Sequence, residues 1–599
     1  MKFPSLQILQ EKTAATVSRF PLAVLAGLVI AFMGIAIIEI QDAQFDSPQI
    51  ETLAKIIFSS LFVFPLFVTV KLLSEIHKFE LRLTTLLNIV VAGLGVLYYL
   101  FLLPEFESGN AIRTLVITII AFLSAIALPL VKEKESLGFW QYLRILIERF
   151  ALTFLYSLIL FLGTALIIFT LNALFNLDIP DKTYPQSWFL IAGAFAPILF
   201  LSEMPADLKK LSKDKDFSKI IKTLGQYLLL PLLTIYALIL YAYGAKILFT
   251  SVWPEGIVSG LIILFALVGI VTLLILDPYK KLKESAWLEK YALGFYVALL
   301  PLAIMLFMAI SIRLREYGIT ESRYYVVLLG IWLVVTAVYF LLSRKKDIRF
   351  IPLSIIVFLT LSIVGPWNAF SVSENSQVLR LRTILEQNNL LVDNKLAHDY
   401  KVETLAPNDQ NQISSIIYYL GQTHGYDKIT PWFSNTNISA TFESKNIWNQ
   451  REELANILNV DPYGYGYYAE DQNYYSFYVE SPGALIVSGY DAVFNVYIYE
   501  ERSNGLNYNN SSYVFHIEDD TQVVMERDGK AIVTLDLLDH LENLMAKYQS
   551  GIVTPAELKF DYEDPSLKAS FQFSNLDAYK DETGWRLNGA NAAVLVKFK

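Results

Sequence analysis

The chain has 599 residues, of which 54% are hydrophobic and 18% charged, and its formal net charge is −9. Soluble domains are less apolar, with roughly 45–50% apolar residues. The absence of cysteine excludes disulfides, thiol catalysis and thiolate metal sites. The sequence contains no basic block of the kind that binds nucleic acid, so no nucleic-acid partner is expected.

Eleven apolar runs, most of them about 17–25 residues long, occupy roughly the first 370 residues. A helix needs about 20 such residues to cross a bilayer core of roughly 30 Å. The sequence therefore predicts a polytopic α-helical membrane protein with about 11 transmembrane helices and a C-terminal soluble α+β domain. The runs lie near 20–40, 53–73, 83–103, 111–131, 146–171, 187–204, 225–249, 261–276, 289–311, 324–342 and 350–366.

The connections between these runs alternate in their content of Lys and Arg. One set carries 21 such residues and the other set four. The positive-inside rule places the N-terminus in the cytoplasm, and an odd number of spans then places the C-terminal domain outside. The first run, Phe20–Ile40, is too long for the apolar region of a signal peptide, so we take it as a retained span. The predicted division is a cytoplasmic segment 1–19, a transmembrane domain 20–367 and an exported domain 368–599.

The exported domain is expected to be helical to about residue 458 and rich in strands after it. Ser373 and Asn408 are candidate N-caps of its first two helices, and Gly421 is the expected stop of the second. Asp528-Gly529 favours a hairpin turn. The predicted helices are Glu374–Gln387, Asp409–Leu420, Asn446–Leu458 and the stretch from Asp536 to Tyr548, and the predicted strands lie in Ala492–Tyr499, Val523–Leu535 and Ala592–Lys599.

A tyrosine-rich stretch follows the third of these helices. Its rings offer flat faces and hydroxyl groups that suit sugars or a protein partner. The alternative is a hairpin whose alternate tyrosines fill the core, which the β-propensity of Tyr favours. Asp461, Glu470 and Asp471 lie nearby, but no ligand ladder of the EF-hand type accompanies them. The candidate aromatic surface consists of Tyr463, Tyr465, Tyr467, Tyr468, Tyr474 and Tyr475.

Known catalytic motifs are missing from the sequence. The five histidines form no HExxH pattern, and no GxxxxGK[ST] loop or GxSxG elbow occurs. We therefore expect no metal, no cofactor and no catalytic residue, and the chain leans toward a non-enzymatic function. Charged residues sit at the ends of the apolar runs, which counts against an ion-coupled transporter. Pro197 lies in a short run rich in small residues, which is either an ordinary kink or a broken helix beside a cavity.

Charged residues gather on the predicted outer side, where the topology rule disfavours positive charge. One interpretation is an ion-pair network that seats the exported domain, with Arg313, Arg315 and Arg323 paired to Glu316, Glu321 or carboxylates of that domain. The other is a site for an anionic lipid or an envelope-sugar headgroup. We call the set of candidate residues the outer collar. It consists of Lys246, Arg313, Arg315, Glu316, Glu321, Arg323 and Trp367.

Three ordered segments resemble a known family. They are LLLPLLTIYALILYAYGAKIL (228–248), IRLREYGITESRYY (312–325) and GPWNAFSVSENSQVLRLRTILEQNNLL (365–391). Together they resemble the bacterial membrane proteins catalogued as domain of unknown function 4153, with similarity from about residue 20 to 433. The resemblance implies a multi-pass protein of the bacterial inner membrane. It implies no activity or catalytic residue, because the family has none established.

Three functions remain open on the sequence. The leading hypothesis is a non-enzymatic envelope protein whose exported domain binds an envelope component or a protein partner. A membrane-embedded glycosyl or lipid-linked transferase is the first alternative, since Glu39, Asp42 and Asp46 place acidic groups on the first outer loop. A passive channel or carrier is the second, and it rests on Pro197 and the small residues around it.

Overall fold

The computed structural model describes residues 6–41, 48–102, 108–131, 136–213, 219–250, 257–396, 405–433, 447–458, 460, 474–479, 485, 487–499, 506–509, 511–548, 551–581 and 584–599. The chain divides into two compact units, Met1–Ser376 and Gln377–Lys599. We call them the apolar unit and the C-terminal unit. The boundary between them falls inside one helix, α15 (Ala369–Gln387).

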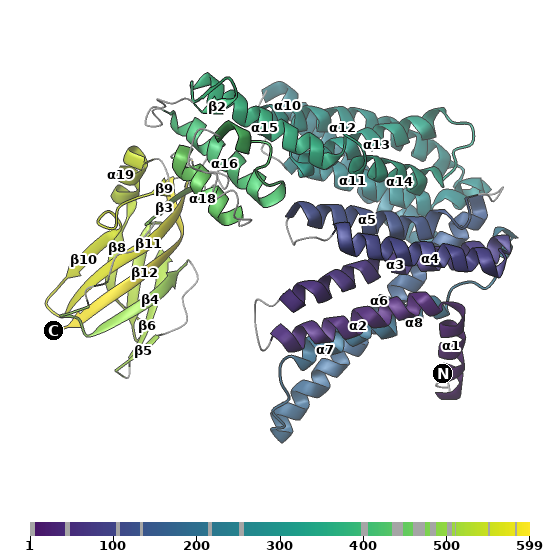
Figure 1. Cartoon of the computed structure of the whole chain (residues 1–599), viewed down its shortest axis with the longest axis horizontal. Coiled ribbons are helices and arrows are strands. Elements are labelled where there is room, and N and C mark those ends of the chain that lie inside the picture. The colour runs from purple at the N-terminus through teal and green to yellow at the C-terminus, as the bar shows by residue number, and fades with distance from the viewer. Residues whose placement is uncertain are drawn as a thin grey trace. The chain divides into compact units, whose positions relative to one another are not determined.

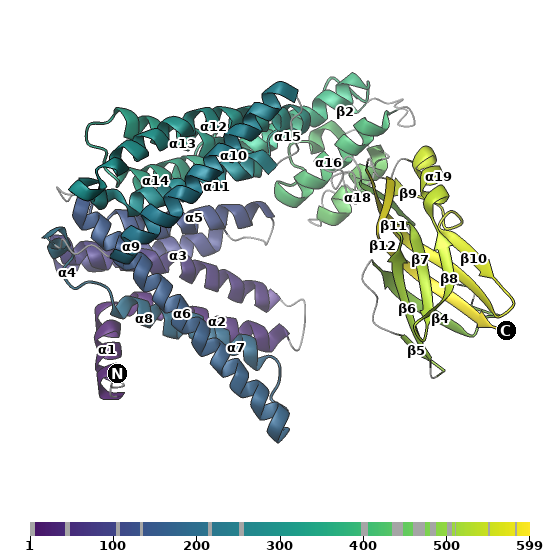
Figure 2. The same cartoon turned by 180° about the vertical axis from the view of Figure 1, so that it is seen from behind.

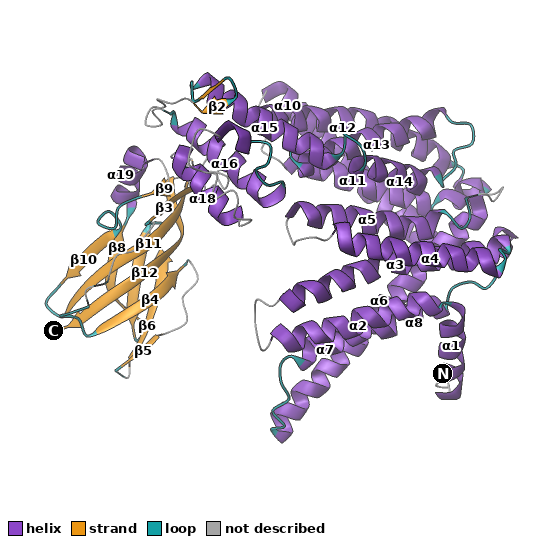
Figure 3. Cartoon of the chain, viewed as in Figure 1, coloured by secondary structure: helices purple, strands orange, loops and turns teal. Residues whose placement is uncertain are grey.

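The apolar unit is entirely helical in its described part, and each of the eleven predicted runs coincides with one of its helices (Figures 1 and 3). Within the described residues, nine helices are long and apolar enough to cross a membrane, and two that match predicted runs, Ala111–Ala127 and Phe350–Ile363, are shorter. Nine of the eleven predicted spans therefore have the length and composition of a membrane-crossing helix, by these criteria, within the described residues. The nine are Pro21–Gln41, Pro48–His77, Leu81–Phe101, Ser136–Phe175, Thr183–Ser202, Ile221–Thr250, Val258–Ile275, Trp287–Tyr317 and Glu321–Leu342.

Several of these long helices are built from shorter elements. Three of them include a π-helical turn, which widens the helix by one residue and is frequent at functional sites. The elements are α1 (Leu6–Arg19), α2 (Pro21–Gln41), α3 (Pro48–His77), α4 (Leu81–Leu97) with η1 (Tyr98–Leu102), α5 (Ser108–Ala127), α6 (Ser136–Phe175), α7 (Thr183–Leu190) with η2 (Ile191–Phe195) and α8 (Ala196–Ser202), α9 (Lys219–Thr223) with η4 (Leu224–Leu229) and α10 (Leu230–Thr250), α11 (Ile257–Ile275), α12 (Trp287–Tyr317), α13 (Glu321–Leu342) and α14 (Phe350–Ile363).

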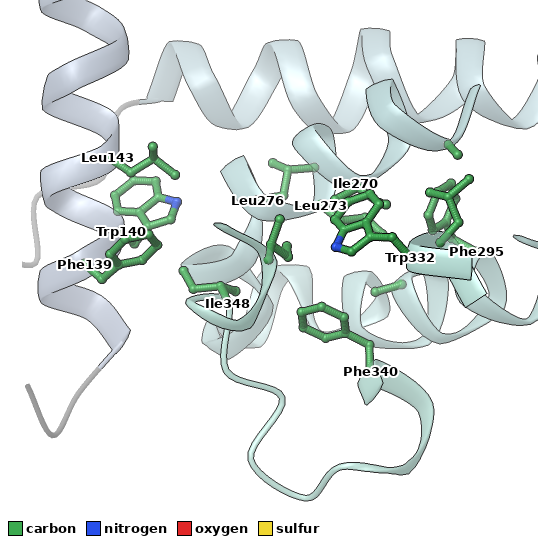
Figure 4. Packing of buried hydrophobic residues seen from close by; sticks show 14 of the residues in the cluster. Phe139, Trp140, Leu143, Ile270, Leu273, Leu276, Phe295, Trp332, Phe340 and Ile348 are labelled. Atoms are coloured by element: carbon green, nitrogen blue, oxygen red, sulfur yellow. The ribbon is translucent and has the colours of Figure 1, made fainter. Parts of the chain in front are cut away.

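A chain of aromatic rings connects the later helices of the apolar unit. It starts at Tyr236 on α10 and ends at Phe350 on α14, with neighbouring ring centroids 3.9–6.2 Å apart. Such ring pairs add roughly 0.5–1.5 kcal/mol each beyond area burial. Figure 4 shows part of the surrounding core. In order, the rings are Tyr236, Phe265, Phe295, Tyr296, Phe340, Tyr339 and Phe350.

The backbones of helix α2 and of the segment around Pro197 come close to each other at two glycines, Gly27 and Gly193. A Cβ atom placed on Gly27 would lie 2.5 Å from the Gly193 carbonyl oxygen, and one placed on Gly193 would lie 2.6 Å from the Ala31 nitrogen. Pro197 has no N–H to donate to the carbonyl four residues earlier, so the Gly193 carbonyl can face the Cα hydrogen of Gly27. The segment around Pro197 is therefore packed tightly against α2 at this point, which favours the ordinary kink over a broken helix beside a cavity.

Charged side chains form pairs at the ends of the helices. Arg19 donates to both carboxylate oxygens of Glu75 at 3.0 and 2.7 Å, and Lys182 donates to Glu39 at 3.0 Å. Arg149 lies 3.2 Å from Glu203. In each of these pairs both residues belong to the same predicted side. The structure and the charge count therefore agree on which helix ends lie together.

The close approach of α2 to η2 predicts a strong position dependence for glycine replacement. We expect Gly193→Ala to destabilise the protein by about 1–3 kcal/mol, because its methyl group overlaps backbone atoms. Gly163→Ala on α6 is the matched control, since nothing lies within 4 Å of a Cβ at that position. The apparent midpoint of thermal unfolding in detergent measures both. Equal midpoints for the two variants would contradict the packing described here.

The first part of the C-terminal unit is a small helical cluster. It contains the second half of α15, α16 (Pro407–Thr423), η8 (Thr430–Phe433), α18 (Ile447–Leu458) and a short hairpin of β1 (Leu391–Val392) and β2 (Lys395–Leu396). The predicted N-caps Ser373 and Asn408 are wrong, and so is the predicted stop at Gly421. Helix α15 starts at Ala369, and Asn368 caps it by accepting from the Ser371 N–H at 2.9 Å. Helix α16 begins at Pro407 after Ala406 and passes the expected stop at Gly421. The cluster core includes Leu381, Leu385, Ile413, Ile417, Leu420 and Leu454.

The second part is a sandwich of two sheets, whose inner faces share one core (Figures 1 and 2). The larger sheet has the order β4-β12-β11-β3-β9 with β10 on β11, and the smaller has the order β5-β6-β7-β8. The predicted hairpin is confirmed, because Asp528 and Gly529 have φ values of 52° and 78° between β7 and β8. The elements are β3 (Tyr474–Tyr478), β4 (Ala492–Ile498), β5 (Leu506–Tyr508), β6 (Ser511–Glu518), β7 (Gln522–Arg527), β8 (Lys530–Asp536), α19 (Leu538–Tyr548), β9 (Gly551–Ile552), β10 (Lys559–Glu563), β11 (Leu567–Asp581) and β12 (Gly584–Phe598).

A single carboxylate ties helix α19 to the turn before β10. Glu557 accepts from Lys547 at 2.5 Å, from Tyr548 at 2.7 Å and from the Thr554 hydroxyl at 2.7 Å. The hydrogen bond from Lys547, followed by those from Tyr548 and Thr554, lowers the pKa of Glu557 from its ordinary value of 4.5 to about 2. Its carboxylate form is thus favoured in the folded chain.

The lowered pKa of Glu557 predicts an acid-sensitive contact. A carboxyl group with a depressed folded-state pKa contributes its full stabilisation above about pH 4.5, and that contribution is lost as the pH falls toward about 2. We expect amide hydrogen exchange in α19 to accelerate across this window, after correction for the intrinsic rate. Glu557→Gln should remove that pH dependence. A wild-type profile that stays flat through the window would show that the contact does not hold α19.

Candidate functional site

The buried members of the outer collar lie at the turn between α12 and α13. Arg323 is 8% exposed, and its guanidinium donates to the carbonyl oxygens of Tyr317 at 3.2 Å and Gly318 at 3.1 Å. Gly318 ends α12 with φ of 70°. Arg323 therefore satisfies carbonyl groups that the end of a helix leaves open, with its charge at the favourable end of the helix dipole. These two acceptors are backbone carbonyls, and the pairing of Arg323 with a carboxylate stays a prediction.

The remaining charges of α12 point outward to different extents. Arg315 and Glu316 are exposed, and Arg313 is half-buried. Within the described part of the chain, Arg315 forms no ion pair. An exposed arginine of this kind contributes little to stability. The predicted pairing of Arg315 with a carboxylate is therefore not seen among the described residues.

Lys246 lies at a different level from the arginines. Helices α10 and α12 run in parallel, since Thr234 contacts Tyr291 at 2.9 Å and Tyr241 donates to the Ala298 carbonyl at 2.6 Å. Both pairs are 57 residues apart in sequence, so Lys246 stands beside about residue 303. Ten further residues separate this level from Arg313, or about 15 Å along a helix. The collar is thus not one cluster in the structure.

The chain leaves α14 and enters α15 through a well-bonded segment. We call residues 365–376 the α15 root. The Tyr324 hydroxyl donates to the Trp367 carbonyl at 2.9 Å, and the Ile319 N–H donates to the Ser376 hydroxyl at 2.9 Å. Both donors lie at or just before the start of α13. The residues around the start of α13 therefore bind both ends of the root.

A third contact joins the root to α5. The Arg113 guanidinium lies 4.2 Å from the centroid of the Phe370 ring, and Phe370 is 5% exposed. A cation over an aromatic face stabilises by about 0.5–2 kcal/mol, more when it is desolvated. Arg113 thus connects the root with α5.

The burial of the root agrees with these contacts. Ala369, Phe370 and Ser373 are buried, while Trp367 is 56% exposed. Ser373, which was expected to cap α15, instead lies in the middle of its first half and faces inward. An exposed Trp beside buried apolar residues is typical of the interface between lipid and water. A partial signal for this site is visible in the sequence, because Arg113 is a charged residue at the edge of an apolar run.

The candidate aromatic surface is only partly within the described residues. Tyr463, Tyr465, Tyr467 and Tyr468 lie outside them, as do Asp461, Glu470 and Asp471. Tyr474 pairs with Tyr579 in the sheet. Tyr475 is half-buried, and its ring lies 5.0 Å from that of Trp585. The ring of Tyr475 therefore contributes to the core of the sandwich, as in the alternative interpretation.

The acidic groups proposed for a transferase differ in what the structure shows. Glu39 accepts from Lys182 at 3.0 Å and from Gln186 at 2.6 Å, so its carboxylate is occupied. Asp42 and Asp46 lie outside the described residues. Among the residues that the structure describes, no group of three or more His, Cys, Asp or Glu side chains could hold a metal ion.

The contact of Arg113 with Phe370 predicts that α15 starts to fray when the cation is removed. We expect Arg113→Ala to raise amide hydrogen exchange at residues 369–376 by about 2- to 30-fold, the equivalent of about 0.5–2 kcal/mol. Arg315→Ala is the control, because its exposed side chain forms no ion pair with another described residue. The same exchange increase in both variants would mean that loss of a nearby charge, not of this contact, loosens the root.

Comparison with known proteins shows which family the chain belongs to. The family model described as Domain of unknown function (DUF4153) matches residues 68–398, more than half of the chain. The Uncharacterized protein PM1469 of Pasteurella multocida (strain Pm70) is 24% identical over 280 residues. That match spans 46% of this chain and 46% of the relative, so it covers less than half the length of either protein. No solved structure matches. The matched range includes the turn between α12 and α13 and the α15 root, and the chain belongs to the DUF4153 family.

Proposed function

We propose that this chain is a non-enzymatic, multi-pass protein of the bacterial inner membrane that displays its C-terminal unit in the periplasm. In this proposal the apolar unit sits in the lipid bilayer with its N-terminus in the cytoplasm. The C-terminal unit binds an envelope component or a protein partner. The resemblance to a bacterial membrane family and the distribution of Lys and Arg support this orientation.

The α15 root is the observation that carries the proposal. The segment entering the C-terminal unit is held by two hydrogen bonds and one cation–π contact, which come from α5, from α13 and from the turn before α13. A flexible tether would need none of these contacts. Holding the start of α15 at the membrane surface fits a protein whose task is to display a domain there.

The two alternative functions have less support. The carboxylate of Glu39 is already bound by Lys182 and Gln186, which leaves the transferase hypothesis with Asp42 and Asp46. An unchanged envelope glycan profile in the double variant Asp42→Ala, Asp46→Ala would remove that hypothesis. The passive channel relied on the segment around Pro197, where Gly27 and Gly193 leave no room for a side chain.

The proposal predicts that capture of a partner depends on the C-terminal unit. We expect the full chain, cross-linked in intact cells and purified in detergent, to retain an envelope protein or glycan. A variant that ends after Ser376 should lose it. Membrane fractionation provides the control, because both chains should be recovered in the membrane. Recovery of the same components with both chains, or of the full chain alone, would contradict the proposal.

A further inference from the structure

The outward face of strand β4 carries exposed aromatic rings. Phe494, Val496 and Ile498 point into the core of the sandwich and are at most 6% exposed. The alternate positions point away from that core, because successive side chains of a strand face opposite sides. Of these, Tyr497 is 68% exposed and Tyr499, which directly follows the strand, is 53% exposed.

The ring of Tyr499 lies against a glycine of the neighbouring strand. A Cβ atom placed on Gly589 would lie 2.9 Å from the Tyr499 ring, so the absence of a side chain there gives the ring its place. An aromatic ring that covers a cross-strand glycine is held close to the backbone. Its exposed fraction of 53% then leaves ring surface open to solvent. The Tyr499 ring is thus held in place against β12 while part of it stays exposed to solvent.

Amide side chains accompany the two rings. Asn591 of β12 is directly opposite Tyr497, and Asn495 occupies the outward position before Tyr497 on β4. We call Asn495, Tyr497, Tyr499 and Asn591 the β4 face. These four side chains are uncharged. In contrast, the edge of the same sheet at β10 carries the pairs Lys559–Asp561 and Lys599–Glu563.

The chemistry of the β4 face selects among ligand classes. Tyrosine rings bury a large apolar area at low conformational cost, and their hydroxyls remain available for hydrogen bonds. Asn side chains both donate and accept. A phosphate or an acidic peptide would need cations, which the face does not supply. A neutral sugar chain offers both the apolar ring faces and the hydroxyl groups that these four residues match.

We propose that the β4 face is a binding site for a neutral oligosaccharide, with Tyr497 and Tyr499 stacking on sugar rings and Asn495 and Asn591 bonding their hydroxyls. This inference rests on the proposed function, since it names the class of envelope component that the C-terminal unit binds. It places an aromatic surface on β4, separate from the predicted one in the tyrosine-rich stretch 463–478, which stays a prediction.

Saturation-transfer difference NMR on the full chain in lipid nanodiscs tests the proposal. The probe is a tetramer of β-1,4-linked N-acetylglucosamine. We expect transfer from the wild-type protein to the sugar ring protons, and affinity reduced about 2- to 12-fold by either Tyr497→Ala or Tyr499→Ala. Tyr497→Phe should keep most of the affinity, because stacking needs the ring. Leu538→Ala, which removes an exposed apolar side chain from α19, is the control and should bind as the wild type does.

Several outcomes would overturn the proposal. They are no transfer to the tetramer, transfer that neither alanine variant reduces, or equal losses in the Phe and Ala variants. Self-association of the full chain that Tyr497→Ala abolishes would assign the face to a second copy of the protein. If the tetramer does not bind but the full chain still retains an envelope protein in the capture experiment, the sugar site is wrong and the proposed function stands.

Discussion

Helices in an apolar solvent must be held together by shape and hydrogen bonds, because lipid tails are as apolar as leucine and supply no hydrophobic force between helices. The apolar unit meets this constraint in two ways. Gly27 and Gly193 let two backbones approach directly where Pro197 frees a carbonyl. Farther along the chain, a series of aromatic rings from Tyr236 to Phe350 joins five consecutive helices. The positions of the helix ends follow from these contacts.

The polar contacts at the helix ends depend on that packing. Arg323 closes the end of α12, and this turn presents Ile319 and Tyr324 to the α15 root. Arg113 reaches the same root from α5. Two helices, α5 and α13, and the turn before α13 therefore hold the start of α15.

Periodicity and turn chemistry made much of the fold predictable. Each apolar run is a helix in the structure, and Asp528-Gly529 forms its turn, since both signals act over a few residues. Features that depend on tertiary contacts could not be predicted from local sequence patterns. Helix α15 starts five residues before the predicted Glu374, because the root packs against α5 and α13. Arg113 is more than 250 residues from Phe370 in sequence, and no local pattern reveals such a pair. The exposure of Tyr497 likewise depends on which face of β4 meets the core.

Single-cysteine labelling reports on which side of the inner membrane a residue lies. It therefore tests whether the C-terminal unit is in the periplasm, as proposed. The native chain contains no cysteine, so each introduced thiol reports alone. A membrane-impermeant maleimide is added to cells with a permeabilised outer membrane. We expect Lys530→Cys at the start of β8 to react in intact inner membranes, whereas Lys210→Cys should react only after lysis. Both side chains are exposed. Labelling of Lys210→Cys before lysis, with Lys530→Cys protected until lysis, would contradict it.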